Sequence, residues 1–244
     1  MLPFLDAFCT DLNAVNSLLK QEFKLKTGSV PELVPLKLEN LDYNLRPALL
    51  LAAARAYGYG GERAIMVASV VQFIYLATKV HGLVNKDVET TPGDFQFPVL
   101  VGDYLYGQFF LHLCKADALE YLTPLSKVIC EIHEAGVIRQ QGADNTSNSL
   151  EVLNKEEASL IAEACRIGAQ LGGAPERDQE LFWQFGRNLG LGIGAFSRGM
   201  GKQWAMQALR EAREVLPMLP VAALSLGEIS RYFENQLSKP NVQY

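Results

Sequence analysis

The chain has 244 residues, of which 49% are hydrophobic, so it can bury a substantial core. Its 27 acidic and 22 basic residues give a net charge of −5, which does not favour a nucleic-acid or anionic-membrane partner. The first 20 residues contain Asp6 and Asp11 and no basic start, unlike a secretory signal. No uncharged apolar run approaches the roughly 18 residues of a membrane span. We therefore expect a cytoplasmic protein with no stable membrane insertion and no nucleic-acid partner.

The first third of the chain has the 3-and-4 spacing of apolar residues that is typical of amphipathic helices. This spacing predicts a first helix from Phe4 to about Lys26. Pro47 suits the first turn of a second helix, which ends before Gly58. Residues 62–84 are apolar on most faces, which predicts a central helix that forms a wall of a cavity.

The rest of the chain continues the helical pattern. Residues 87–93 (DVETTPG) are rich in turn formers, and residues 142–149 (GADNTSNS) predict a surface loop. Further helices are predicted from Pro98 and over residues 118–141, 158–171, 177–200, 203–216 and 226–237. No period-two alternation indicates a strand. The fold prediction is therefore all-α: one single-domain helical bundle, residues 1–244, around a central apolar cavity.

Cysteines and histidines form no metal or redox motif. The four cysteines, at positions 9, 114, 130 and 165, are too scattered for a zinc site and are interpreted as small buried hydrophobic residues. The three histidines are His81, His112 and His133, too few for a multi-histidine site. Val137 stands where an HExxH motif starting at His133 needs its second histidine.

The glycine-rich stretch GLGIGAF contains Gly190, Gly192 and Gly194. A dinucleotide-binding loop needs a preceding strand and a third glycine at another offset, and both are missing here. We interpret these glycines as places where two helices approach closely.

Several segments occur in an order that is typical of one enzyme family. Leu45-Arg46-Pro47 with ALLLAAARAYG resembles the GKRxRP segment of the trans-prenyl diphosphate synthases, which add isopentenyl diphosphate to an allylic diphosphate. Further resemblances are VVQFIYLATKVHG (70–82) to the helix that ends in the first aspartate-rich motif, VGDYL (101–105) to GDxL, and residues 163–174 and 185–196 to the helices before the second motif. The resemblance implies an isoprenoid-synthase-like fold.

The same resemblance marks where two magnesium-binding aspartate clusters would stand. The first position holds Gly82, Leu83, Val84, Asn85 and Lys86, and the second holds Ser197, Arg198, Gly199, Met200 and Gly201. Neither contains a carboxylate. Because Mg²⁺ prefers oxygen ligands, two such clusters cannot hold several divalent ions. We expect no catalytic residue, no metal and no cofactor on this chain, with magnesium only on a catalytic partner.

Other family positions are altered as well. Tyr43 and Asn44 replace a lysine and an arginine that bind isopentenyl diphosphate in the family, and Glu156-Glu157 replaces a Lys-Thr pair. Acidic residues thus face a place that should attract a diphosphate. Arg46 remains, and with Lys86 it forms the candidate diphosphate-binding pair.

Three residues of the predicted central helix are candidates for the cavity wall. Tyr75 replaces the family's histidine, and Ala77 and Thr78 align with positions where side-chain bulk limits product length. Two small residues at these positions are compatible with a deep cavity, but simple core packing is the more common reason for them.

Three functions remain open. The leading hypothesis is a non-catalytic subunit of a heteromeric polyprenyl diphosphate synthase, partnered with a homologous catalytic chain, with a homodimer as the other assembly. The second is a metal-independent prenyl- or lipid-binding protein. The third is a divergent enzyme that uses acids among Asp87, Glu89, Asp94 and Asp103. Because Tyr244 comes early for the family, shortened C-terminal helices are also expected.

Overall fold

The computed structural model describes residues 3–25, 28–29, 34, 36, 38–84, 96–140 and 146–239. Its α-helices are α1 (Pro3–Asp6), α2 (Cys9–Glu22), α4 (Asn40–Arg55), α5 (Glu62–His81), α6 (Gln96–Lys115), α7 (Leu122–Gln140), α8 (Thr146–Leu153), α9 (Ser159–Leu171), α10 (Glu176–Ser197), α11 (Lys202–Val215) and α12 (Gly227–Ser238). Short 3-10 turns are η1 (Leu119–Tyr121), η3 (Leu216–Met218) and η4 (Val221–Leu226), and η2 (Asn154–Ala158) is a π-helical turn. The all-α prediction is confirmed.

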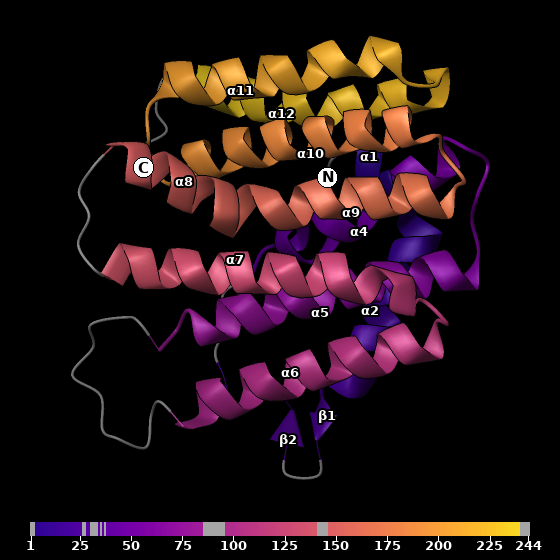
Figure 1. Ribbon diagram of the computed structural model, residues 1–244, viewed down its shortest axis with the longest axis vertical. Helices are drawn as coiled ribbons and strands as arrows, with labels where there is room; N and C mark the ends of the chain where they lie inside the picture. Colours follow the sequence, from indigo (N-terminus) through magenta and orange to yellow (C-terminus); the bar gives the residue numbers. More distant parts are fainter. Residues whose placement is uncertain are drawn as a thin grey trace.

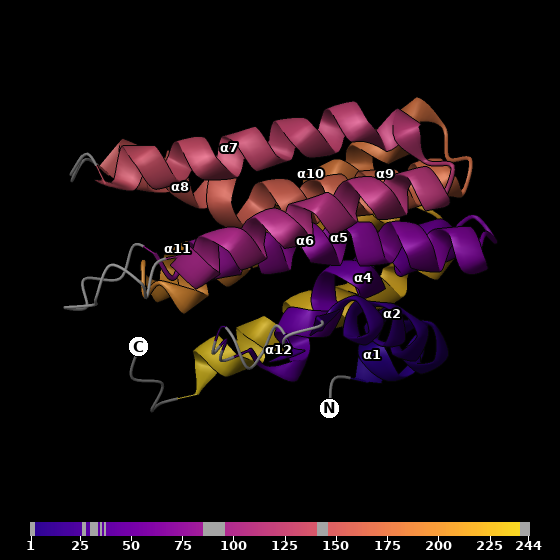
Figure 2. The ribbon, with the colours of Figure 1, turned by 90° about the horizontal axis from the view of Figure 1, so that it is seen from below.

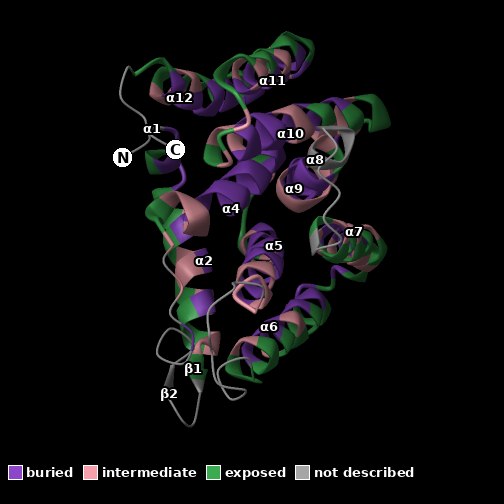
Figure 3. Ribbon diagram, turned by 90° about the vertical axis from the view of Figure 1, so that its left-hand side faces the viewer, coloured by how far each residue is buried: buried purple, intermediate pink, exposed green. Residues whose placement is uncertain are grey.

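The long helices run nearly side by side in stacked layers (Figure 1). Helices α11 and α12 form one edge, followed by α10, α9, α7 and α5, with α6 at the other edge. Helices α1, α2 and α12 lie on the face opposite α7 (Figure 2). This arrangement leaves α5 in the interior, where it packs against α2, α4, α6, α7 and α9 (Figure 3). The predicted central helix is therefore confirmed.

Helix α4 begins seven residues before the proline that was predicted to open it. A capping box starts it: the Glu39 N–H donates to Asp42 Oδ2 over 2.9 Å, and the Glu39 side chain accepts from the Asp42 backbone. Pro47 therefore lies inside the helix, where it leaves the carbonyl of Tyr43 without its usual donor. The predicted start at Pro47 is wrong because the cap outweighs the proline.

The predicted first helix is interrupted and ends early. Its chain turns at Ala7 and Phe8, where the Phe8 N–H donates to the carbonyl of Leu5 over 3.1 Å. After Glu22 the backbone forms an antiparallel pair of two-residue strands, β1 (Lys24–Leu25) and β2 (Gly28–Ser29). Lys24 and Leu25, which the predicted helix would have included, instead pair with Ser29 and Gly28.

Part of the predicted surface loop is helical. Residues 146–149 form the start of α8, and α8, the π turn η2 and α9 follow one another without a break. Residues 142–145 and the turn-rich segment 87–93 lie outside the described residues. Helix α8 was missed because its first residues, TSNS, are polar and poor helix formers.

The three glycines of GLGIGAF act as predicted. A Cβ at Gly190 would lie 2.6 Å from Ala158 Cα, and one at Gly194 would lie 2.9 Å from Glu157 Cβ. On the other side of α10, a Cβ at Gly192 would lie 2.6 Å from Leu209 Cγ. The prediction of close helix contacts is confirmed, and the contacts bring α10 against both η2 and α11.

The prediction for the cysteines is largely wrong. Cys165 is buried on α9, whereas Cys9, Cys114 and Cys130 are exposed. The last three lie on the solvent faces of outer helices, a position that scattered spacing alone does not reveal.

One described helix, α5, has the length and mean hydropathy (1.5) of a membrane span. Its most apolar window is 72% buried inside the bundle, which is the environment of a core helix.

Candidate functional site

A cavity of about 820 Å³ opens between the C-terminal ends of α5 and α10. Helix α7 and the π turn η2 form its other side, and Arg46 of α4 and Asp103 of α6 also reach it. The prediction was an apolar cavity, but the lining of this one is mixed. Four cationic side chains and three carboxylates share it with leucines, valines and an isoleucine. The charged residues are Arg46, Lys79, Arg139, Arg198, Asp103, Glu156 and Glu157.

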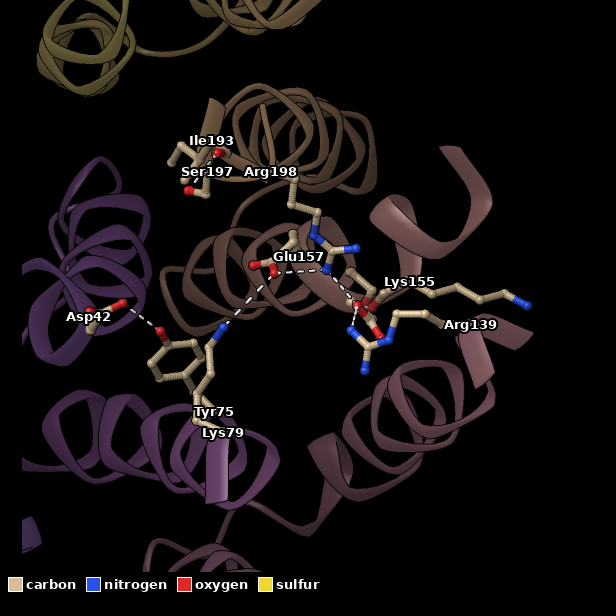
Figure 4. Close-up of polar contacts among 11 residues, drawn as sticks. Asp42, Tyr75, Lys79, Arg139, Lys155, Glu157, Ile193, Ser197 and Arg198 are labelled. Atoms are coloured by element: carbon tan, nitrogen blue, oxygen red, sulfur yellow. Dashed lines mark hydrogen bonds and ion pairs between the residues drawn. The ribbon is translucent and has the colours of Figure 1, made fainter. Parts of the chain in front are cut away.

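An ion-pair cluster occupies one side of this cavity (Figure 4). The guanidinium of Arg198 lies 2.5 Å from Glu156 Oε2 and 3.1 Å from Glu157 Oε1. Arg139 lies 3.2 Å from Glu156, and Lys79 lies 3.9 Å from Glu157. Each of the two carboxylates is therefore held by two cations, and Arg198 bridges them. We call these five residues the Arg198 cluster.

The π turn places both carboxylates in the cluster. A regular helix turns by about 100° per residue, so adjacent residues point apart. The wider turn over Asn154–Ala158 presents Glu156 and Glu157 together to Arg198. Such turns are frequent at functional sites.

The charges in the cluster stabilise one another. Burial by itself would raise the pKa of Glu157, but the positive charges of Lys79, Arg198 and Arg46 outweigh it and hold the pKa below its ordinary value. Burial would likewise lower the pKa of Arg198, and Glu157 and Glu156 raise it instead. Both groups therefore stay ionised at neutral pH.

Arg46 lies deeper and is bound differently. Its side chain is buried, and its guanidinium stacks 3.5 Å from the centre of the Tyr75 ring. Its Nε has no hydrogen-bond partner in the part of the chain that the structure describes. The Tyr75 hydroxyl donates to Asp42 Oδ1 over 2.5 Å, which fixes the ring beneath the arginine. Burial raises the pKa of Tyr75, so the ring stays neutral. Among the described residues, Arg46 has no ion-pair partner within 4.0 Å.

A second group of polar side chains lies at the rim. His81 Nε2 is 3.3 Å from both Asp103 Oδ1 and the carbonyl oxygen of Val99. The Tyr106 hydroxyl lies 2.8 Å from His133 Nε2, and the two histidine rings are 5.7 Å apart. Burial, then the charge of His81, lowers the pKa of His133. In the sequence these histidines are far apart and form no motif. The packing of α5, α6 and α7 brings His81 and His133 together.

The residues at the first predicted cluster only partly reach the cavity. Gly82 and Leu83 line it, whereas Lys86 lies outside the described residues, as do Asp87, Glu89 and Asp94. The proposed pairing of Arg46 with Lys86 therefore stays a prediction.

At the second predicted cluster, residues 197–201, only Arg198 lines the cavity. Ser197 donates to the carbonyl of Ile193 in its own helix, and Gly201 precedes α11 with a φ of 106°. The position therefore presents a cation to the cavity and no carboxylate.

The wall residues on α5 divide by helical face. Tyr75 and Thr78 line the cavity, but Ala77 is fully buried and does not. Lys79 was missed, although it lies four residues after Tyr75 on the same face. Arg139 was also missed, because only the packing of α7 against η2 brings it to the cavity.

The described residues do not fit magnesium ions. Glu156 and Glu157 already contact two cations each, and Asp103 contacts His81 with its side chain 65% exposed. Among the described residues, no group of three or more histidine, cysteine or acidic side chains is arranged to hold a metal. A divalent ion here would have to displace a tethered guanidinium.

Comparison with known proteins places this geometry in a family. The polyprenyl synthetase family model matches residues 42–193. The chain is 24% identical to an octaprenyl diphosphate synthase of Escherichia coli, over 86% of this chain and 71% of that protein. It is 26% identical to component 2 of a heptaprenyl diphosphate synthase of Geobacillus stearothermophilus, over 74% and 60%.

Solved structures share the fold. A decaprenyl diphosphate synthase from Rhodobacter capsulatus superposes with a TM-score of 0.82 at 22% identity, covering 96% of this chain and 98% of that one. A heptaprenyl diphosphate synthase from Staphylococcus aureus gives 0.79 at 16% identity, covering 93% and 98%. Since the family model spans well over half of the chain, this protein belongs to the polyprenyl synthetase family.

Proposed function

We propose that this chain is a non-catalytic subunit of a heteromeric polyprenyl diphosphate synthase in isoprenoid biosynthesis, and that it acts in the cytoplasm. The observation that carries the proposal is the Arg198 cluster. Where the resemblance expects an anionic site for metal, the cavity holds a guanidinium bound to two carboxylates.

Prenyl transfer begins when an allylic diphosphate departs, and divalent cations stabilise the charge that develops on it. The mouth described here offers no free carboxylate set to hold such ions, and removing Arg198 from Glu156 and Glu157 would break two short ion pairs. Ionisation at this cavity should therefore be very slow.

A partner follows from the same reasoning. A subunit that cannot ionise the substrate contributes by stabilising a homologous catalytic chain and by shaping the cavity that sets product length. The heptaprenyl relative is named a component, which supports an assembly of unlike chains. Thr78 and Tyr75 on α5 are the wall residues through which product length would be set.

The experiment mixes the purified chain with a homologous synthase from the same organism that retains both aspartate motifs. We expect a complex by size-exclusion chromatography with light scattering, and product lengths that differ from those of the synthase alone. In the complex, Thr78→Phe should shorten the product, whereas Gln207→Phe, at an exposed position of α11, should not. Failure to associate with any such synthase contradicts the proposal.

A second arm uses the chain alone. With isopentenyl diphosphate, an allylic diphosphate and Mg²⁺, we expect no release of diphosphate above the rate without protein. Magnesium-dependent release would contradict the non-catalytic role and favour a divergent enzyme.

Arg46 favours a second candidate, a metal-independent site for a prenyl diphosphate or similar lipid anion. Its buried Nε lacks a hydrogen-bond partner among the residues that the structure describes, and a phosphate oxygen would accept from it. Calorimetric titration with farnesyl diphosphate in EDTA tests this candidate. We expect Arg46→Met to weaken binding by at least about 10-fold, while Arg55→Met, on the exposed side of α4, leaves it unchanged. The absence of both heat and thermal shift would rule it out.

A further inference from the structure

A second cavity lies against the same π turn as the first. Its volume is about 320 Å³, and α7, η2, α9 and α10 line it. Asn154 and Lys155 of η2 line this second cavity, whereas Glu156 and Glu157 of the same turn line the first. Figure 4 shows the Lys155 side chain extending away from Arg198. Pockets for small molecules range from about 300 to 1,000 Å³, so the second cavity suits a compact ligand.

Most charged side chains around the second cavity already have partners within the chain. The ion pairs, with the distances between their nitrogen and oxygen atoms, are Arg166–Glu163 (2.8 Å), Lys127–Glu131 (3.9 Å), Lys155–Glu134 (2.8 Å) and Lys155–Glu151 (2.8 Å). Glu180 accepts a hydrogen bond from Gln184 over 3.2 Å. The charges of these groups are therefore largely balanced before any ligand binds.

Two polar groups that line the second cavity have no partner in the described part of the chain. The guanidinium of Arg187, on a half-buried side chain, forms no hydrogen bond or ion pair there. The Oδ1 atom of Asn154 is buried and accepts no hydrogen bond from any described residue. Arginine only donates, and an amide oxygen only accepts. Because buried polar groups are costly to leave unpaired, a ligand with an acceptor for Arg187 and a donor for Asn154 would stabilise both.

Trp183 adds an aromatic surface to the second cavity. It lies four residues before Arg187 on α10, so both side chains share one helical face. Its side chain is half-buried, and Pro124 and Val128 of α7 provide further apolar lining. A tryptophan ring stacks favourably on another flat ring. The second cavity therefore combines an aromatic wall with the cation of Arg187 and the acceptor of Asn154.

We propose that the second cavity binds a small aromatic carboxylate that carries an N–H or O–H donor. The carboxylate pairs with Arg187, the ring lies against Trp183, and the donor meets Asn154 Oδ1. One guanidinium without a partner among the described lining residues matches a single negative charge, which favours a carboxylate over a diphosphate.

This inference does not rest on the proposed function, because the two cavities share no lining residue among those described. The turn η2 nevertheless connects them. Asn154 belongs to the same turn as Glu156 and Glu157, so a ligand held by Asn154 also restrains the turn that presents these carboxylates to Arg198.

Calorimetric titration of the whole chain with indole-3-acetate tests the proposal, since this probe has a flat ring, a carboxylate and an N–H group. We expect a Kd of about 1 mM or tighter for a ligand of this size. Two analogues separate the contacts. Replacing the N–H with N–CH3 (1-methylindole-3-acetate) and replacing the carboxylate with an alcohol (indole-3-ethanol) should each weaken binding by about 5-fold or more.

Three variants assign the contacts to residues. Arg187→Met should weaken binding of indole-3-acetate by at least about 10-fold and leave that of indole-3-ethanol unchanged. Asn154→Leu should abolish the difference between indole-3-acetate and its N-methyl analogue. Arg177→Met, at an exposed position of the same helix as Arg187, is the matched control and should bind like wild type.

Circular dichroism verifies that each variant is folded. Because Arg187 has no partner among the described residues, Arg187→Met should melt at the wild-type temperature. If Asn154→Leu disturbs η2, Arg187→Met and the two analogues still decide the outcome.

Three results would overturn the proposal. They are no heat from indole-3-acetate well above the expected Kd, equal binding of the three probes, and binding that Arg187→Met does not weaken. Failure to associate with a catalytic synthase would instead contradict the proposed function and leave this inference standing.

Discussion

The helix crossing around α9 and the charged mouth of the cavity obey opposite rules. At the crossing, a Cβ on Gly168 would lie 2.2 Å from the carbonyl oxygen of Leu50, and one on Gly186 would lie 2.8 Å from Ala162 Cα. At the mouth, charged side chains with exposed fractions of 11% to 26% meet through flexible ends. At the crossing, the backbones lie so close that no side-chain atom can be added to these glycines. At the mouth, one charged side chain can be replaced by another without moving a helix. A family can therefore keep its scaffold while the chemistry of its site changes.

The largest expected effect comes from adding one methyl group at the crossing. Gly168→Ala should cost more than about 3 kcal/mol of unfolding free energy, because the methyl group overlaps a backbone oxygen and α4 and α9 must separate. Urea denaturation followed by circular dichroism measures the change. A Cβ added at Gly136 of α7 would meet nothing within 4 Å, so Gly136→Ala should instead stabilise the folded chain by about 0.5–1 kcal/mol. Equal changes in unfolding free energy for the two variants would contradict the view that the crossing tolerates no added atom.

Removing the central cation of the mouth should cost less. Arg198→Met leaves Glu156 with Arg139 and Glu157 with Lys79, so we expect a loss of about 2 kcal/mol, below that of a fully orphaned buried charge. The same denaturation experiment applies. Arg210→Met, at an exposed position on α11, should stay within about 0.5 kcal/mol of wild type. An Arg198 variant as stable as this control would mean that the cluster contributes nothing to folding.

A smaller effect depends on pH. The pKa of Glu157 is lowered in the folded chain, so its stabilisation is present above the unfolded pKa of about 4.3 and is lost as pH falls through the folded pKa. Glu157→Gln should therefore cost about 1 kcal/mol at pH 7, and the difference from wild type should vanish once the pH falls below the folded pKa of Glu157. Melting temperatures between pH 3 and pH 8 measure it. A difference that persists at the lowest pH would assign the cost to packing.

The smallest effect has the opposite sign and lies outside the cavity. Burial raises the pKa of Glu163 despite its contact with Arg166, so the folded chain binds this proton more tightly than the unfolded chain. Stability from this group is complete below about pH 4.3 and falls as pH rises through the folded pKa. Relative to wild type, Glu163→Gln should gain up to about 1 kcal/mol between pH 4 and pH 7. Melting temperatures of wild type and Glu163→Gln over the same pH range measure this gain. A difference between the two that does not change with pH would contradict the prediction.

Much of the scaffold could be predicted from local patterns. The periodicity of α5 and α10 and the glycines of GLGIGAF depend on residues a few positions apart, and the structure agrees with them. The errors have local causes as well. A capping box at Glu39 outweighed Pro47, and a hairpin after Glu22 took over backbone groups assigned to a helix.

The candidate site was predictable only in part. Arg46, Tyr75 and Arg198 could be named because each stands at a fixed place within a recognisable segment. Arg139 and His133 could not, because α7 meets η2 and α6 through packing that no short pattern encodes. Ala77 was placed on the wall, but the rotation of α5 directs it into the core.

The order of amino acids determined which stretches form helices and that the two positions expected to bind metal carry no carboxylate. Tertiary structure decided that Arg198 bridges Glu156 and Glu157, that Arg139 joins them from another helix, and that the residues of η2 line two different cavities. The reason is the separation along the chain over which each effect acts. Helix formation depends on neighbours within four residues, whereas charge pairing and burial depend on how whole helices cross.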